Sequence, residues 1–167
     1  MKTKKLVLAG LMTALVFIMT ALLKMALPGG GYANLGDIAV LLSGVLLEPG
    51  AAFLASGLGS ALSDFLWLPI YTPLTFCLKG VMALIVSLAR KHDRPFLAAA
   101  IPAELLMIVV YYAADAWVFN PLTALSALGG NAAQALIGCT AAAVLTRILK
   151  NNQAIQRIEH EKRGKKS

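Results

Sequence analysis

The sequence has few of the side chains on which most enzymes and disulfide-bonded proteins depend. It contains 2 cysteines and 2 histidines in 167 residues, and only 14% of the residues are charged. Cys77 and Cys139 both lie in apolar stretches without a CxxC spacing, so we expect no disulfide, metal site or resident cofactor. An HExxH motif and a Gly-rich phosphate loop are also missing. The sequence therefore predicts that the protein is not an enzyme and does not hydrolyse ATP.

Apolar residues are abundant, at 59% of the chain. A soluble domain of this size would be left with a largely apolar surface. The sequence thus predicts an all-α integral membrane protein with one transmembrane domain over residues 1–150. A basic cytoplasmic tail, residues 151–167, follows it and either favours anionic lipid or is simply solvated.

The number of membrane crossings depends on the segment Glu48-Pro49-Gly50, which interrupts a long apolar run. If this segment is a turn, the chain makes six crossings, and if it is a kink, five. With six crossings, a short second helix and both termini in the cytoplasm, all basic residues except Lys24 and Lys79 lie on the cytoplasmic side, which the positive-inside rule favours. The last three spans are expected at Pro73–Ala89, Pro95–Ala116 and Ser126–Leu149.

The stretch from Gly57 to Gly80 consists of two apolar segments joined by a Pro-bracketed turn, and it contains Asp64 and Lys79. A charge at the centre of a membrane helix costs roughly 2.5–3.5 kcal/mol, so these residues should face protein or water. On the six-helix topology most polar residues fall in the outer half, which predicts an outward-facing pocket for a small heteroaromatic ligand. The predicted ligand-binding residues are Tyr32, Asn34, Asp37, Asp64, Tyr71, Thr75, Lys79, Glu104, Tyr112, Asp115 and Asn131.

Some of these residues also have purely structural interpretations. Lys79 could form an ion pair with Glu104 or Asp64, and Asp37 could be the N-cap of the second helix. The polar loop from Pro28 to Asp37 either folds over a ligand or only connects two helices.

The first helix carries two overlapping pairs of small residues at a spacing of four. They are Ala9 with Thr13, and Gly10 with Ala14. Such a strip lets another helix approach closely. It predicts either docking of a partner subunit or packing within the chain.

Several segments resemble the substrate-binding S component of energy-coupling factor (ECF) vitamin transporters. They are Gly-Tyr-Ala-Asn-Leu-Gly-Asp at 31–37, Leu-Glu-Pro-Gly at 47–50, Gly-Ser-Ala-Leu-Ser-Asp at 59–64, Pro-Leu-Thr-Phe-Cys-Leu-Lys-Gly at 73–80 and Pro-Ala-Glu at 102–104. The resemblance implies six helices in a prokaryotic cell membrane and a micronutrient bound from outside beneath the first loop. It also implies docking through the first helix onto a transmembrane coupling subunit with two ATPases.

Within this family the chain looks similar to members associated with riboflavin, pyridoxine or the hydroxymethylpyrimidine precursor of thiamine. We favour a pyridine-like or pyrimidine-like vitamin, with riboflavin as the alternative. Two other classes stay open: an accessory membrane subunit that binds no ligand, and a small membrane enzyme with Glu104 or Asp115 as base, for which no nucleophile is visible. Nucleic acid is not an expected partner.

Overall fold

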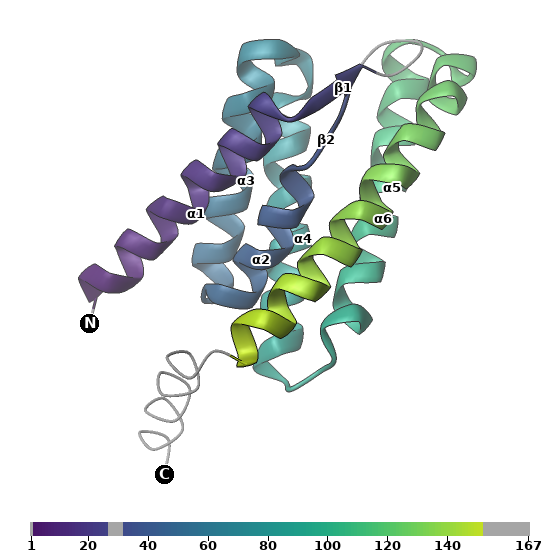
Figure 1. Ribbon diagram of the computed structural model, residues 1–167. Helices are drawn as coiled ribbons and strands as arrows, with labels where there is room; N and C mark the ends of the chain where they lie inside the picture. The colour runs from purple at the N-terminus through teal and green to yellow at the C-terminus, as the bar shows by residue number, and fades with distance from the viewer. Residues whose placement is uncertain (1, 27–31, 152–167) are drawn as a thin grey trace.

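The computed structural model of the chain describes residues 2–26 and 32–151, which are almost entirely helical (Figure 1). The elements in chain order are α1 (Lys2–Leu22), β1 (Lys24–Ala26), β2 (Tyr32–Asn34), α2 (Gly36–Leu46), α3 (Pro49–Trp67), the 3₁₀ helix η1 (Pro69–Tyr71), α4 (Thr72–Lys91), α5 (Phe96–Val118) and α6 (Pro121–Asn151). The described residues thus confirm the prediction that the chain forms six α-helices. The predicted tail beyond Asn151 lies outside the described residues.

Within residues 2–26 and 32–151, four helical segments are long and apolar enough to cross a membrane: Thr3–Leu22, Pro69–Lys91, Phe96–Val118 and Pro121–Asn151. By contrast, α2 has only 11 residues and spans roughly 17 Å at 1.5 Å per residue, well short of a ~30 Å hydrocarbon layer. The structure therefore shows an apolar helical bundle with four candidate spans, and six crossings stay a prediction.

The segment around Pro49 is a turn between two helices, as predicted, and not a kink. Proline suits the first turn of α3 because its missing N–H would have no helical partner there. The carbonyl oxygen of Leu47 accepts hydrogen bonds from Ser87 Oγ at 2.8 Å and from Arg90 Nη2 at 3.0 Å. Two side chains of α4 thus hold this turn in place.

Glycine allows α3 and α4 to pack closely. A Cβ atom at Gly57 would lie 2.7 Å from the carbonyl oxygen of Phe76, and one at Gly80 would lie 2.7 Å from the ring of Phe53. The two phenylalanine rings meet edge to face, with centroids 5.5 Å apart. The Gly57 to Gly80 stretch is therefore a helical hairpin whose two arms interlock.

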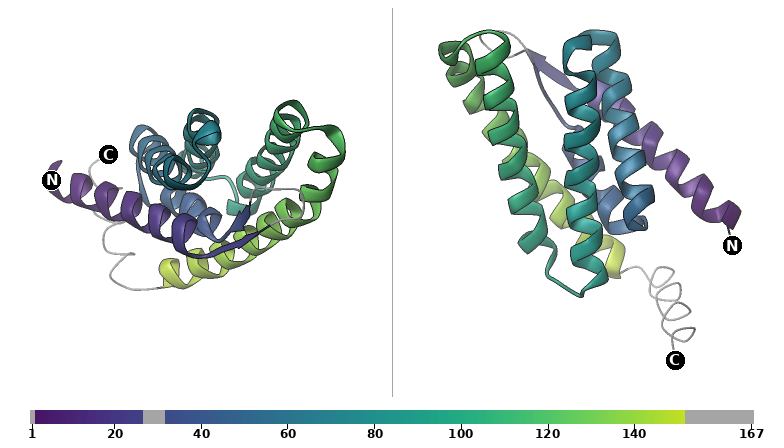
Figure 2. Two further views of the ribbon diagram at one scale, coloured as in Figure 1. Left: turned by 90° about the horizontal axis from the view of Figure 1, so that it is seen from above. Right: turned by 180° about the vertical axis from the view of Figure 1, so that it is seen from behind.

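The short helix α2 lies inside the bundle. It packs against α1, α3, α4 and α6, and residues 36–44 are all buried. Figure 2 shows it among these helices when the bundle is seen from above. A helix too short to cross a membrane alone is thus enclosed by its neighbours.

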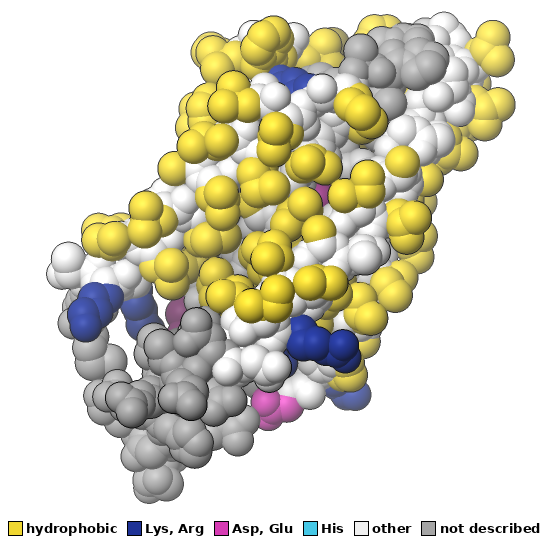
Figure 3. Space-filling view, viewed as in Figure 1, with side chains coloured by type: hydrophobic (Ala, Val, Ile, Leu, Met, Phe, Trp, Pro, Cys, Tyr) yellow, Lys and Arg dark blue, Asp and Glu magenta, His cyan; other side chains and the backbone are white. Residues whose placement is uncertain are grey.

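The two ends of the bundle differ in charge. We call the end with β1, β2, η1 and the α5–α6 turn the hairpin end, and the opposite one, with the α2–α3 and α4–α5 turns, the basic end (Figure 1). Basic side chains gather at the basic end, as the space-filling view shows (Figure 3). These side chains come from the first turn of α1, the last turns of α4 and α6, and the α4–α5 turn. They are Lys4, Lys5, Arg90, Lys91, Arg94, Arg147 and Lys150.

Two expectations from the sequence need correction: the residue at which α6 begins, and the structure of the polar loop. Helix α6 begins at Pro121, not Ser126, because Asn120 Oδ1 accepts the backbone N–H of Thr123 at 2.9 Å and caps the helix one turn earlier. The expected polar loop is partly a β-hairpin, in which Lys24 pairs with Asn34. Its residues 27–31 lie outside the described residues.

Candidate functional site

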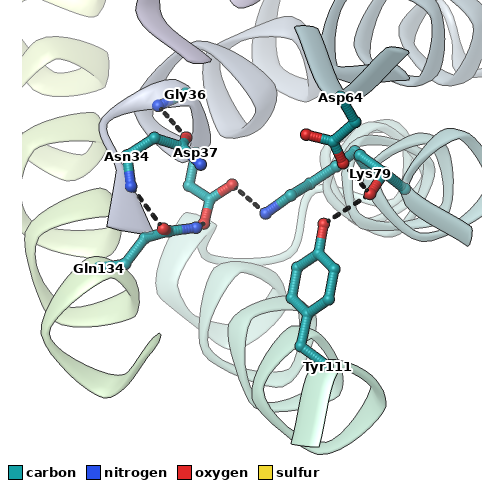
Figure 4. Close-up of polar contacts among 8 residues, drawn as sticks. Asn34, Gly36, Asp37, Asp64, Lys79, Tyr111 and Gln134 are labelled. Atoms are coloured by element: carbon teal, nitrogen blue, oxygen red, sulfur yellow. Dashed lines mark hydrogen bonds and ion pairs between the residues drawn. The ribbon is translucent and has the colours of Figure 1, made fainter. Parts of the chain in front are cut away.

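A buried polar network joins β2, α2, α4 and α6 (Figure 4). Asp37 lies in the first turn of α2, and its two carboxylate oxygens accept hydrogen bonds from Lys79 Nζ and, at 2.6 Å, from Gln134 Nε2. Gln134 Oε1 in turn accepts the backbone N–H of Asn34 at 2.7 Å. Lys79 and Asp37 are only 2% and 1% exposed. We call Asn34, Asp37, Lys79 and Gln134 the inner network.

This network corrects two structural interpretations of the sequence. Lys79 forms its ion pair with Asp37, not with Glu104 or Asp64. The N-cap position of α2 is Leu35, so Asp37 is not the cap and instead turns its side chain toward α4 and α6. The Asn34 side chain takes over part of the capping, because its Oδ1 accepts the N–H of Gly36 at 2.8 Å.

A second set of polar contacts lies nearer the hairpin end. The Thr75 hydroxyl donates to Asp64 Oδ2 and lies 2.9 Å from the hydroxyl of Tyr111. The hydroxyl of Tyr71, in η1, donates to Asp115 on α5. We call these five residues the outer network. It connects the α3–α4 hairpin to α5.

Lys79 belongs to the inner network and also lies next to the outer network. Its Nζ, bound to Asp37, is 5.5 Å from the centroid of the Tyr111 ring, within range of a cation–π contact. Tyr111 also contacts the ring of Tyr71, with centroids 6.1 Å apart. Carboxylates, an amide, an ammonium group and two aromatic rings thus converge from α2, η1, α4, α5 and α6. Such a set can orient a small planar ligand.

The remaining predicted ligand residues are placed differently. Glu104 on α5 and Asn131 on α6 are buried, at 2% and 6% exposure. Tyr112 is 37% exposed, so its side chain does not join the buried networks that include its neighbour Tyr111. Tyr32 is placed by its backbone in β2, opposite Ala26.

The predicted set omits Gln134 and Tyr111, which are central to the two networks. Gln134 follows Asn131 by three residues and thus shares its helix face, a spacing that was available in the sequence. Tyr111 is adjacent to Tyr112, and sequence alone does not decide which of two consecutive helix residues points inward in an apolar helix.

Lys24 fastens the hairpin to α3. Its Nζ lies 4.3 Å from the centroid of the Trp67 ring. Partial burial lowers the pKa of Lys24, and the nearby Asp64 carboxylate partly offsets this effect. With Asn34 held by Gln134 of α6, the hairpin is attached on both sides of the bundle.

The small-residue strip of α1 divides into two halves. Thr13 faces α3, since a Cβ atom at Gly59 would lie 2.6 Å from the Thr13 carbonyl oxygen, and Ala9 is half-buried. Gly10 and Ala14 are exposed, and a Cβ atom at Gly10 would meet no heavy atom of the described residues within 4 Å apart from the nearby backbone of α1 itself. The first pair therefore packs within the chain, and the second is accessible.

Comparison with known proteins agrees with this fold. Residues 1–151 match the family described as "ECF-type riboflavin transporter, S component". A protein of Pyrococcus woesei, "Uncharacterized protein in gap 3'region", is 29% identical over 139 residues, which cover 81% of this chain and 94% of that one. A structure reported as "Structure and mechanism of the S component of a bacterial ECF transporter" matches with a TM-score of 0.72 at 19% identity, covering 90% of this chain and 98% of that one.

Proposed function

The chain belongs to the family of ECF-type riboflavin transporter S components, the membrane substrate-binding subunits of ECF transporters, and from this premise we propose how it takes up its ligand. It captures a small heteroaromatic vitamin at the hairpin end of the bundle, among the side chains of the inner and outer networks. It then delivers this vitamin by docking on a transmembrane coupling subunit that works with two ATPases. The single observation that carries the proposal is the inner network, in which side chains of α2, α4 and α6 and a backbone N–H of β2 meet in one buried polar cluster.

The charge difference between the two ends supports the orientation. Basic residues concentrate at the basic end, and the positive-inside rule assigns such an end to the cytoplasm. The N-terminus of α1 and the C-terminus of α6 both lie at this end (Figure 1). We therefore infer six crossings of a prokaryotic cell membrane, with both termini in the cytoplasm and the hairpin end outside. An impermeant thiol reagent should then label a cysteine at Asn120 but not one at Lys91 in intact cells.

The chemistry of the networks supports a planar ligand with several polar atoms. Riboflavin fits the family description at least as well as the pyridine or pyrimidine vitamin that the sequence favours. Aromatic rings provide stacking surfaces, and the fixed amide, hydroxyl and charged groups provide orientation. Buried polar residues in membrane helices commonly mark substrate pathways.

The partner surface is the exposed half of the α1 strip. Gly10 and Ala14 present little side chain to the surroundings, and small residues allow two helices to approach closely in lipid. Thr13 already contacts α3, so the register for docking is Gly10 with Ala14 and not Ala9 with Thr13.

Mass spectrometry of ligand that co-purifies with the full-length protein from rich medium tests the proposal. We expect one heteroaromatic vitamin, and isothermal titration with riboflavin, pyridoxine and hydroxymethylpyrimidine should then show tight binding of that one. Binding of all three with equal, weak affinity, or of none by a well-folded preparation, would contradict a vitamin-binding role.

A further inference from the structure

Glu104 is a buried carboxyl group that receives no hydrogen bond from any donor in residues 2–26 and 32–151. It projects from α5 and is 2% exposed. A Cβ atom at Gly138 would lie 2.9 Å from Glu104 Oε1 and 3.1 Å from Asp37 Cβ. The carboxyl group of Glu104 is therefore packed between the backbone of α6 and the side chain of Asp37.

The side chain that packs beside Glu104 at Gly138 is that of Asp37, because both surround the same position on α6. Its carboxylate is another acceptor, and its two oxygens already accept from Lys79 and Gln134. The charged or titratable side chains around Glu104 are Asp37 from α2, Lys79 from α4 and Cys139 from α6. Two carboxyl groups thus share a single ammonium group.

Charge balance decides the protonation of this cluster. Lys79 neutralises one carboxylate, and a second carboxylate in contact with the first would be an uncompensated charge in a low-dielectric interior, which is far more costly than binding a proton. Two adjacent carboxyl groups that cannot both ionise share one proton. The Asp37 oxygens already accept from two donors, whereas the Glu104 carboxyl receives none from the described residues.

We propose that Glu104 is protonated in the ligand-free protein and donates a hydrogen bond to the Asp37 carboxylate, so that the bundle contains an internal proton-binding site. This proton gives Glu104 a hydrogen-bond partner that the described residues otherwise do not provide. The site adjoins the inner network, so ligand affinity depends on this proton. That consequence rests on the proposed function, whereas the proton itself does not.

Infrared spectroscopy of the purified full-length protein without ligand tests the assignment. We expect a C=O stretching band of a protonated carboxylic acid at neutral pH that shifts when the protein is labelled with carboxyl-carbon-13 glutamate. The band should be lost in Glu104→Gln. It should also be lost in Asp37→Asn, because Glu104 then ionises and becomes the partner of Lys79. Glu48→Gln, at an exposed position, is the matched control and should retain it.

Three results would overturn the proposal: a wild-type spectrum without a glutamate-shifted acid band, a band that survives Glu104→Gln, or a band that survives Asp37→Asn in a folded protein. The isotope-labelled wild type tests the protonation of Glu104 even where a variant does not fold. Because no ligand is added, a negative result here leaves vitamin binding untouched. If the protein fails to bind a vitamin, the infrared band still tests the protonation of Glu104.

Discussion

The first two helices of the chain are both apolar, yet the bundle uses them in opposite ways. In α2, residues 36–44 are buried, including Asp37. In α1, large apolar side chains such as Leu11 and Leu22 are exposed, and Gly10 has open space beside it. Hydropathy thus indicates that both helices belong to a membrane protein, whereas packing decides whether a helix faces its own chain or the surroundings.

This difference predicts that α2 and its contacts govern stability and ligand binding, while the exposed face of α1 governs association. Substitutions in the two regions should therefore separate these properties. The expected loss of stability of the isolated subunit decreases from the buried pair at α2 to the exposed strip of α1.

Removing the ammonium group from the inner network should have the largest effect. Lys79→Met leaves Asp37 buried without its counterion, and breaking a buried pair in this way costs about 3–5 kcal/mol. Thermal unfolding in detergent should show a large loss of stability together with loss of ligand binding. Lys5→Met is the control, because the pair of Lys5 with Glu48, 3.6 Å apart, is exposed and worth about 0–1 kcal/mol. If the two variants were equally stable, the buried pair would contribute no more to stability than the exposed pair.

Adding one methyl group should distinguish the interior of α2 from the surface of α1. At Gly44 a Cβ atom would lie 2.6 Å from Val86 Cβ and 2.7 Å from the carbonyl oxygen of Ala83. Gly44→Ala should therefore destabilise the protein by about 1–3 kcal/mol through overpacking. In Gly10→Ala the added methyl group meets no other part of the described chain within 4 Å, apart from the adjacent backbone of α1, so this variant should unfold at the wild-type temperature or slightly above. If Gly44→Ala were as stable as Gly10→Ala, α2 would not be as tightly enclosed as described.

Removing a single hydroxyl from the outer network should have a smaller effect. Thr75→Val keeps the shape of the side chain but loses the hydrogen bonds to Asp64 and Tyr111, each worth about 1 kcal/mol net. We expect a modest drop in unfolding temperature and a several-fold weaker affinity for the co-purified vitamin. Thr140→Val, on the exposed side of α6, makes the same chemical change and should alter neither. Unchanged affinity in Thr75→Val would remove this hydroxyl from the ligand site.

Enlarging the exposed strip of α1 should leave the isolated subunit intact. In the double variant Gly10→Leu with Ala14→Leu, the added side chains extend into open surroundings, so we expect unchanged stability and vitamin affinity. The variant should nevertheless fail to co-purify with the coupling subunit and fail to support uptake, because close helix packing drives association in lipid. Normal uptake would exclude this strip as the docking surface, and loss of vitamin binding would mean that the strip packs within the chain.

Much of the secondary structure could be predicted because its signals are local. Apolar runs broken by proline and glycine indicate the helices, and the charge distribution correctly distinguishes a turn at Pro49 from a kink. The predicted start of α6 is wrong by five residues, since capping by Asn120 depends on one side-chain contact that composition does not reveal. The resemblance to the S-component family, made on short motifs, is confirmed by the match over residues 1–151.

The sequence predicts which types of residue form the candidate site, but not which of these residues contact one another. Asp64, Lys79 and Glu104 stand out because charges are rare in an apolar chain, but the partner of Lys79 is Asp37, 42 residues away. Gln134 joins Asp37 across 97 residues. Sequence spacing cannot give such contacts, because they depend on the rotation of each helix about its axis.

The sequence by itself determined that this chain is an apolar helical bundle with a basic end and a few polar residues that must be sheltered. Composition and the local order of residues along the chain decide these properties, because water and lipid impose them whatever the fold. Only the tertiary structure decided that α2 is enclosed while α1 is exposed, that Lys79 neutralises Asp37, and that Glu104 is left next to a second acceptor. The physical reason is that nearly every face of these helices is apolar, so the hydrophobic pattern does not select which face turns inward. Close contacts at Gly44, Gly57 and Gly80 and the satisfaction of buried polar groups make that choice.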